Sequence, residues 1–312
     1  AKLERIMNAS KIVKQTFVAL ACAAFLLAGI LPNQAQAQTL GQMLENTRTE
    51  HTRPPAPRSD PEPPRQSKPS KKEASWHWRD YEREEEDDDN DGVIAGLVGV
   101  LTAAALSSPF WGPRAIIDDE GFDAGYFPRY PYLHDSDGYL TSNPTKERGT
   151  YPWLLRACFE YGDDFDAIDT FGGSFLLDTS SRFGIDAEFN RRHEVLPTGS
   201  DTLWNGNSNI LVRFAQSERV QMRAGIGWNW LEHSSGSEHG LNFTYSGDFF
   251  PADPWIISSE IDLGWLGHAG VIHLRTTAGI QFHRFEAYSG FDHFQIGADN
   301  ITGPVFGLRL WY

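Results

Sequence analysis

The last ten residues, Gly303-Pro304-Val305-Phe306-Gly307-Leu308-Arg309-Leu310-Trp311-Tyr312, decide the fold class. Side chains in a β-strand alternate between two faces, so residues two apart point in the same direction. One face of this stretch is entirely apolar and consists of Phe306, Leu308, Leu310 and Tyr312. The other face consists of Val305, Gly307, Arg309 and Trp311. The stretch therefore predicts a strand with one face suited to apolar surroundings.

The same alternation continues from Tyr151 to the C-terminus. In its clearest example, Val220, Met222, Ala224, Ile226, Trp228 and Trp230 share one face, and Gln221, Arg223, Gly225, Gly227 and Asn229 share the other. We predict about ten antiparallel strands, at residues 152–162, 167–178, 182–195, 203–216, 219–232, 240–250, 255–266, 271–282, 285–297 and 302–312. Eight strands remain an alternative, because the fourth and ninth segments alternate less clearly. An even number brings both ends of the strand series to the same side.

The connections between these segments differ in length. Tight turns are predicted at Thr179–Arg182, Ser217–Glu218, Pro251–Pro254 and His283–Arg284. Longer polar loops are predicted on the side of the barrel opposite these turns, at Leu196–Leu203 and His233–His239. The other two connections on that side, Asp164–Asp166 and Leu266–Gly270, are short.

The contents of the two faces indicate which one meets water. A soluble β-sandwich or lipocalin-like barrel also alternates, with its apolar face inward. Here the polar faces carry charges of both signs, and Trp and Tyr gather near strand ends, as in the interfacial girdles of membrane barrels. We therefore expect a barrel interior in which opposite charges pair. Its charged residues are Arg156, Glu160, Asp186, Glu188, Arg213, Arg223, Glu260, Asp262, Arg275 and Arg309.

The alternating final strand with its terminal aromatic residue resembles the closing strand of bacterial outer-membrane β-barrels. The resemblance covers about residues 151–312 and identifies a class, with no specific family. It implies an all-β fold, a closed antiparallel transmembrane β-barrel. It also implies outer-membrane lipid as the surroundings and a barrel-assembly machinery as a partner. The assembly signal would be the apolar face Phe306, Leu308, Leu310 and Tyr312.

The N-terminal part divides into three segments. Residues 1–37 read as a cleaved secretory signal peptide, because basic residues precede an apolar run and the small residues of Ala35-Gln36-Ala37. Residues 38–91 are Pro-rich and acidic, which predicts a disordered linker. Residues 92–150 are expected to form a short apolar helix at Gly92–Leu106, ended by Pro109 and Pro113, and then an irregular aromatic segment.

Composition and motifs exclude several kinds of chemistry. The net charge of −15 argues against nucleic acid as a partner. The chain has no nucleotide-binding glycine loop, HExxH helix or GxSxG elbow, and Cys158 is the one cysteine after the signal peptide. We expect no cofactor and no metal. Residues considered for catalysis near an outer rim are Asp292, His293, His233, His239 and His268.

These observations lead to a ranked set of functions. We expect a non-enzymatic outer-membrane barrel with a structural, anchoring or interaction role. Its N-terminal arm would be periplasmic and would engage an envelope partner. The first alternative is a narrow pore for small solutes, since opposed charges line channel constrictions. The second alternative is a hydrolase at the barrel rim.

Overall fold

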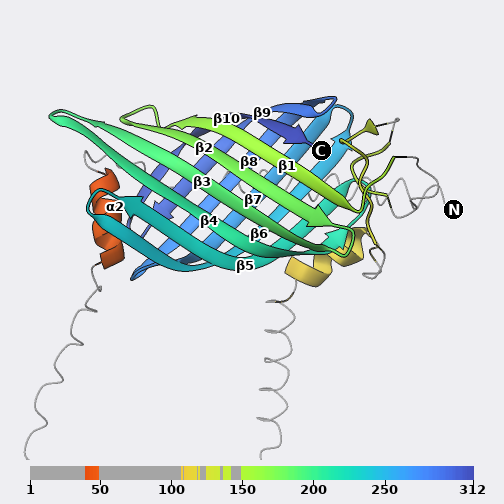
Figure 1. The fold of residues 1–312 in the computed structure, drawn as a ribbon, viewed down its shortest axis with the longest axis horizontal. Coiled ribbons are helices and arrows are strands. Elements are labelled where there is room, and N and C mark those ends of the chain that lie inside the picture. The colour runs from red at the N-terminus through yellow and green to blue at the C-terminus, as the bar shows by residue number, and fades with distance from the viewer. Residues whose placement is uncertain are drawn as a thin grey trace, which may run out of the picture. The chain divides into compact units, whose positions relative to one another are not determined.

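The computed structural model describes residues 39–48, 107, 109–117, 119, 124–133, 136–141 and 149–312. Ala1–Glu50 and Pro109–Tyr312 belong to one compact unit, and His51–Ser108 to another. The expected signal peptide, most of the expected linker and the expected apolar helix at 92–106 lie outside the described residues. The account below concerns the first unit (Figure 1).

Ten antiparallel strands form a closed barrel, as predicted. The strands are β1 Trp153–Asp163, β2 Ile168–Thr179, β3 Phe183–Leu196, β4 Gly199–Gln216, β5 Val220–His233, β6 Gly236–Ala252, β7 Trp255–Leu266, β8 Ala269–Phe282, β9 Phe285–Ile296 and β10 Asp299–Trp311. Each strand pairs with its neighbours in the sequence, and β1 pairs with β10 from Arg156↔Trp311 to Gly162↔Val305. The terminal stretch that set the fold class is therefore the strand that closes the cylinder.

Two of the predicted loops are wrong. Residues 199–203 and 236–239 extend strands β4 and β6, and the hairpins turn tightly instead. The pairs Leu196↔Gly199 and His233↔Gly236 close these hairpins. Both glycines have positive φ, 152° and 143°, which lets the chain reverse in so few residues. Polar composition had suggested loops, but turn geometry set the boundaries.

Along the middle of the strands, apolar side chains face outward and charged ones face inward, whereas apolar side chains near the strand ends, such as Leu203 and Leu211, are buried. Ile226 is 70% exposed and Leu308 57%, whereas Arg213 is fully buried and Arg223 is 1% exposed. Val220 is an exception to the outward pattern, since it is buried beside its partner Phe249. The wall of the barrel thus has the arrangement expected of a membrane barrel and opposite to that of a lipocalin-like barrel.

The first mouth of the barrel is covered by helix α2, Thr39–Arg48. This helix lies where the sequence predicted disordered linker, so that prediction is wrong for these residues. Leu40, Met43, Leu44 and Thr47 recur at helical spacing and are all buried. They pack against apolar side chains from the strand ends, namely Ile168, Leu203, Leu231, Leu266, Ala269, Val271, Phe294, Ile296 and Ile301.

The barrel supplies caps at both ends of α2. At the N-terminus, the backbone N–H groups of Thr39 and Leu40 donate to the Glu194 carboxylate at 2.9 and 3.1 Å. At the C-terminus, the backbone N–H of His268 donates to the Thr47 carbonyl at 2.8 Å. A carboxylate at the positive end of the helix dipole adds an electrostatic contribution. The helix is held because its ends and its apolar face find partners only in the closed barrel.

The second mouth is filled by residues from the segment before β1. Phe127 and Tyr139 are fully buried there, and strand residues surround them. The cluster comprises Phe127, Tyr132, Tyr139, Leu140, Leu154, Leu176, Leu211, Phe250, Ile256 and Trp311. The expected irregular aromatic segment thus contributes Phe127, Tyr132 and Tyr139 to the filling of this mouth.

Residues 109–117 are helical and contain both Pro109 and Pro113, whereas the apolar helix that these prolines were expected to end lies outside the described residues. Proline is tolerated where its missing N–H breaks no needed bond. Here Pro113 leaves the Pro109 carbonyl without its helical donor. The Tyr245 hydroxyl donates to that carbonyl at 2.8 Å and satisfies it.

Candidate functional site

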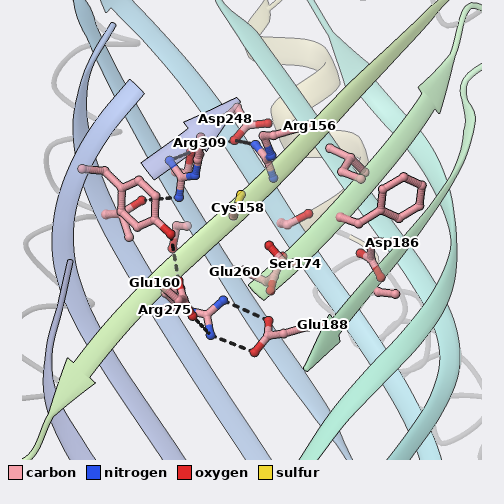
Figure 2. Close-up of a pocket in the computed structure, with 18 of the residues that line it drawn as sticks. Arg156, Cys158, Glu160, Ser174, Asp186, Glu188, Asp248, Glu260, Arg275 and Arg309 are labelled. Carbon is pink, nitrogen blue, oxygen red and sulfur yellow. Dashed lines mark hydrogen bonds and ion pairs between the residues drawn. The ribbon is translucent and has the colours of Figure 1, made fainter. Parts of the chain in front are cut away.

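The interior between the two apolar mouths is a layer of charged and polar side chains. A cavity of ≈ 50 Å³ lies in it, and Figure 2 shows the side chains around it. Seven of the ten charged residues predicted to face inward line this cavity: Arg156, Glu160, Asp186, Glu188, Glu260, Arg275 and Arg309. Arg213 and Arg223 are buried nearer the mouth filled by Tyr139, and Asp262 is buried beside His273.

The first charge network joins three arginines through two aspartates. Arg223 donates to Asp178 at 2.8 Å and to Asp248 at 2.7 Å. Asp178 also pairs with Arg213, and Asp248 with Arg156. Each carboxylate therefore bridges guanidinium groups from different strands.

The second network is centred on Arg275. Its guanidinium donates to both oxygens of Glu188 at 2.9 and 2.8 Å. It also lies 2.9 Å from Glu160 and 3.2 Å from Asp292. His273 shares Asp292 at 2.7 Å and Arg192 lies 3.7 Å from it, so two arginines and one histidine serve three carboxylates.

A smaller group links the closing strand to its neighbour. Arg309 Nη1 donates to Glu286 Oε1 at 2.7 Å, and the Trp311 indole N–H donates to Glu286 Oε2 at 3.0 Å. The Glu286 carboxylate is fully buried, so both of its oxygens depend on these two donors.

Sequence reasoning missed several members of these networks. Asp178, Asp248, Arg192 and His273 are all buried in the interior. Residue parity is the signal that finds them: Asp178 follows the inward Leu176 by two positions, and His273 precedes the inward Arg275 by two. Parity gives the face of a strand, whereas the partners across the barrel depend on register.

The size of the cavity limits what the interior can hold. Since a water molecule needs about 10–15 Å³ of such space, the ≈ 50 Å³ cavity has room for a few waters. Two further interior cavities measure ≈ 10 Å³ each. Among the described residues, side chains therefore fill the rest of the interior, as in other barrels of narrow diameter.

The residues considered for catalysis are dispersed. Asp292 serves Arg275 and His273, while the adjacent His293 contacts the Thr302 hydroxyl at 2.6 Å. His239 packs against the Trp228 ring. His233 is different, because its ring contacts both a carboxylate and a hydroxyl.

Within the described ranges, the structure has neither a metal-ligand cluster nor a membrane-spanning helix. No group of three or more His, Cys, Asp or Glu side chains there has the arrangement to hold a metal ion. No helix in the same ranges is long and apolar enough to cross a membrane.

Comparisons with known proteins show no family for this chain. No protein-family model matches the chain, and no curated protein matches it. One similar solved structure is Ail, the attachment invasion locus protein of Yersinia pestis. It is 7% identical, with 51% of this chain and 96% of Ail covered at a TM-score of 0.26. Another is the CymD monoaromatic hydrocarbon channel, at 11% identity, covering 50% of this chain and 56% of the channel at a TM-score of 0.28. At these TM-scores the two likenesses carry no argument, and the closed ten-stranded barrel rests on the strand pairing itself.

Proposed function

We propose that this chain is an outer-membrane β-barrel with a sealed interior and a structural or anchoring role. The observation that carries the proposal is the reversal of the usual soluble pattern. Large apolar side chains such as Ile226, Trp228 and Leu308 stand on the outer wall, while the interior is charged. In water, an outer wall of this kind would be an aggregation hazard. Transfer of this apolar wall from water into lipid is favourable, as for the apolar band of a membrane barrel.

The interior argues against the pore alternative. Arg275 and Arg223 are held by two or more carboxylates each, so they cross-link the walls in place of lining an open path. Apolar clusters around Leu44 and Tyr139 cover the charged layer from both sides. A conducting barrel needs a continuous wet path of weak sites.

Membrane residence is tested by fractionation with a heat-modifiability gel. The expected result is a protein in the membrane fraction whose gel mobility changes on boiling. A product that remains in the soluble fraction with unchanged mobility contradicts the proposal.

Conductance separates the sealed barrel from the pore. The purified protein should give no current steps in planar bilayers. The double variant Leu40→Asp/Leu44→Asp, which loosens α2, should also give none because the charged layer remains. Current steps in the native protein, altered in size by Arg275→Glu, would establish the pore instead.

The position of α2 bears on the proposed arm. Its partners lie in the hairpins at one end of the barrel, whereas Tyr312 ends the strand at the other end. An arm held entirely on the side of the C-terminus does not fit this position. A cysteine at the exposed Glu45 tests the side by labelling intact cells with an impermeant maleimide, since the native Cys158 is buried. The maleimide is expected to label this cysteine only when it is applied to the side of the membrane opposite the C-terminus.

A further inference from the structure

Three polar side chains from adjacent hairpins form a connected chain at the rim beside α2. The His233 ring, at the end of β5, lies between Asp201 of β4 and Ser235 of the β5–β6 turn. Its Nε2 is 2.6 Å from Asp201 Oδ1, and its Nδ1 is 2.8 Å from Ser235 Oγ. Asp201 is itself fixed, because its Oδ1 accepts the Thr202 backbone N–H at 2.8 Å.

The hydrogen bonds assign the proton on the neutral ring. The backbone N–H of Ser235 points at His233 Nδ1 at 3.3 Å, so Nδ1 acts as an acceptor. The ring proton therefore sits on Nε2, where Asp201 accepts it. This leaves the Nδ1 lone pair directed at the hydroxyl of Ser235. Ser235 is thus placed as the nucleophile, His233 as the base and Asp201 as the carboxylate that orients the base. In the familiar serine hydrolases Nε2 faces the serine and Nδ1 the carboxylate, whereas here the two ring nitrogens are exchanged.

The three side chains differ in solvent exposure in the way that a serine nucleophile with a shielded base requires. The His233 side chain is 10% exposed and that of Asp201 23%, so the base and its carboxylate are largely shielded. Ser235 is exposed and reachable. Arg48 of α2 donates to the Ser235 backbone carbonyl at 3.0 Å and pairs with Glu238 at 3.2 Å, so its side chain ties α2 to this turn.

A groove of ≈ 490 Å³ on the outer wall includes His233 and lies next in sequence to Asp201 and Ser235, through Thr202 and Ser234. It is lined by Thr202, Trp204, Trp230, Glu232, His233 and Ser234. Ligand sites typically measure about 300–1,000 Å³. The two indole rings belong to the outward face, so an acyl chain lying along the barrel would reach the groove from the apolar surroundings.

We propose that Asp201, His233 and Ser235 form a serine-esterase site for acyl esters of membrane lipids. Ser235 Oγ attacks the ester carbonyl while His233 Nδ1 takes its proton, and the ester C–O bond breaks. The leaving alcohol receives that proton. Water then hydrolyses the acyl-serine by the same route, which releases the fatty acid and restores Ser235. This proposal departs from our expectation of no enzymatic activity and is independent of whether the interior conducts.

The test uses the full chain in detergent with a long-chain alkyl fluorophosphonate. Mass spectrometry of the labelled protein should place the probe on Ser235. Fatty-acid release from phosphatidylethanolamine–phosphatidylglycerol vesicles should be lost in Ser235→Ala. Asp201→Asn and His233→Gln should each slow labelling by about 100-fold or more, the range for loss of a general base.

Ser237→Ala is the matched control, since Ser237 is an exposed serine two positions away in β6. It should label and hydrolyse as the native chain does. Each variant is first checked for the heat-dependent gel shift, so loss of folding is distinguished from loss of chemistry. Absence of labelling in the folded native chain, or labelling at another serine, would overturn the proposal.

Discussion

The Tyr139 ring meets the Trp311 ring edge-on, with 4.8 Å between centroids and 80° between planes. A residue from the segment before the barrel thereby packs on the strand that closes it. Tyr139→Ala should lower the free energy of unfolding by about 3–5 kcal/mol, the usual cost of removing a buried aromatic ring. Urea titration followed by gel mobility measures it.

Tyr139→Phe provides the matched control. Within the described residues, the Tyr139 hydroxyl is buried without a hydrogen-bond partner. Removing it should leave the urea midpoint unchanged or raise it, because an unsatisfied buried hydroxyl is costly. A large loss of stability in this variant would mean that the hydroxyl has an essential partner.

Charge on the outer wall distinguishes lipid from water as the surroundings. Ile226→Arg should cost about 2–4 kcal/mol if the middle of the wall faces hydrocarbon. Phe165→Arg, in an exposed turn, should cost about 0–1 kcal/mol, as near an interface. Refolding into lipid vesicles at increasing urea concentrations gives both values. Equal, small effects at the two positions would indicate an aqueous outer surface.

Removing one partner of the Arg309–Glu286 pair should lower the free energy of unfolding strongly, whereas replacing both partners with apolar residues should lower it little. Arg309→Met leaves the buried Glu286 carboxylate with the Trp311 indole as its remaining donor and should destabilise the barrel by about 3–5 kcal/mol. The double variant Arg309→Met/Glu286→Leu should regain most of that loss, since apolar replacements of buried pairs are often neutral. The urea midpoints of the single and double variants measure this difference. A double variant no more stable than the single one would contradict the expectation that apolar side chains can replace the pair.

Alkaline pH should loosen the mouth that holds Tyr132 and Tyr139. Burial raises the pKa of both phenols above their ordinary value. A phenol with a raised pKa contributes stability that is present below its unfolded pKa of about 10 and lost as pH rises beyond it. Limited proteolysis near Gly138 should therefore accelerate above about pH 10. Tyr132→Phe should reduce this dependence, and an unchanged profile would contradict the assignment.

Alternation in the sequence predicted about ten strands, with eight as an alternative, and the face of most of their residues, but it placed the ends of β4 and β6 wrongly. It identified Arg223 and Glu188 as inward but not their partners, because strand register determines which residues meet across the barrel. It missed α2 because Leu40, Met43 and Leu44 are few apolar residues in a polar segment. Such a helix is stable only when a mouth exists to receive it.

The docking of α2 has a consequence for the order of assembly. Leu40, Met43 and Leu44 share one apolar cluster with Ile168 of β2 and Ile301 of β10. That receptor is complete only after β10 has joined β1. The earliest described part of the chain is therefore the latest to settle, and its docked state reports that the cylinder has closed.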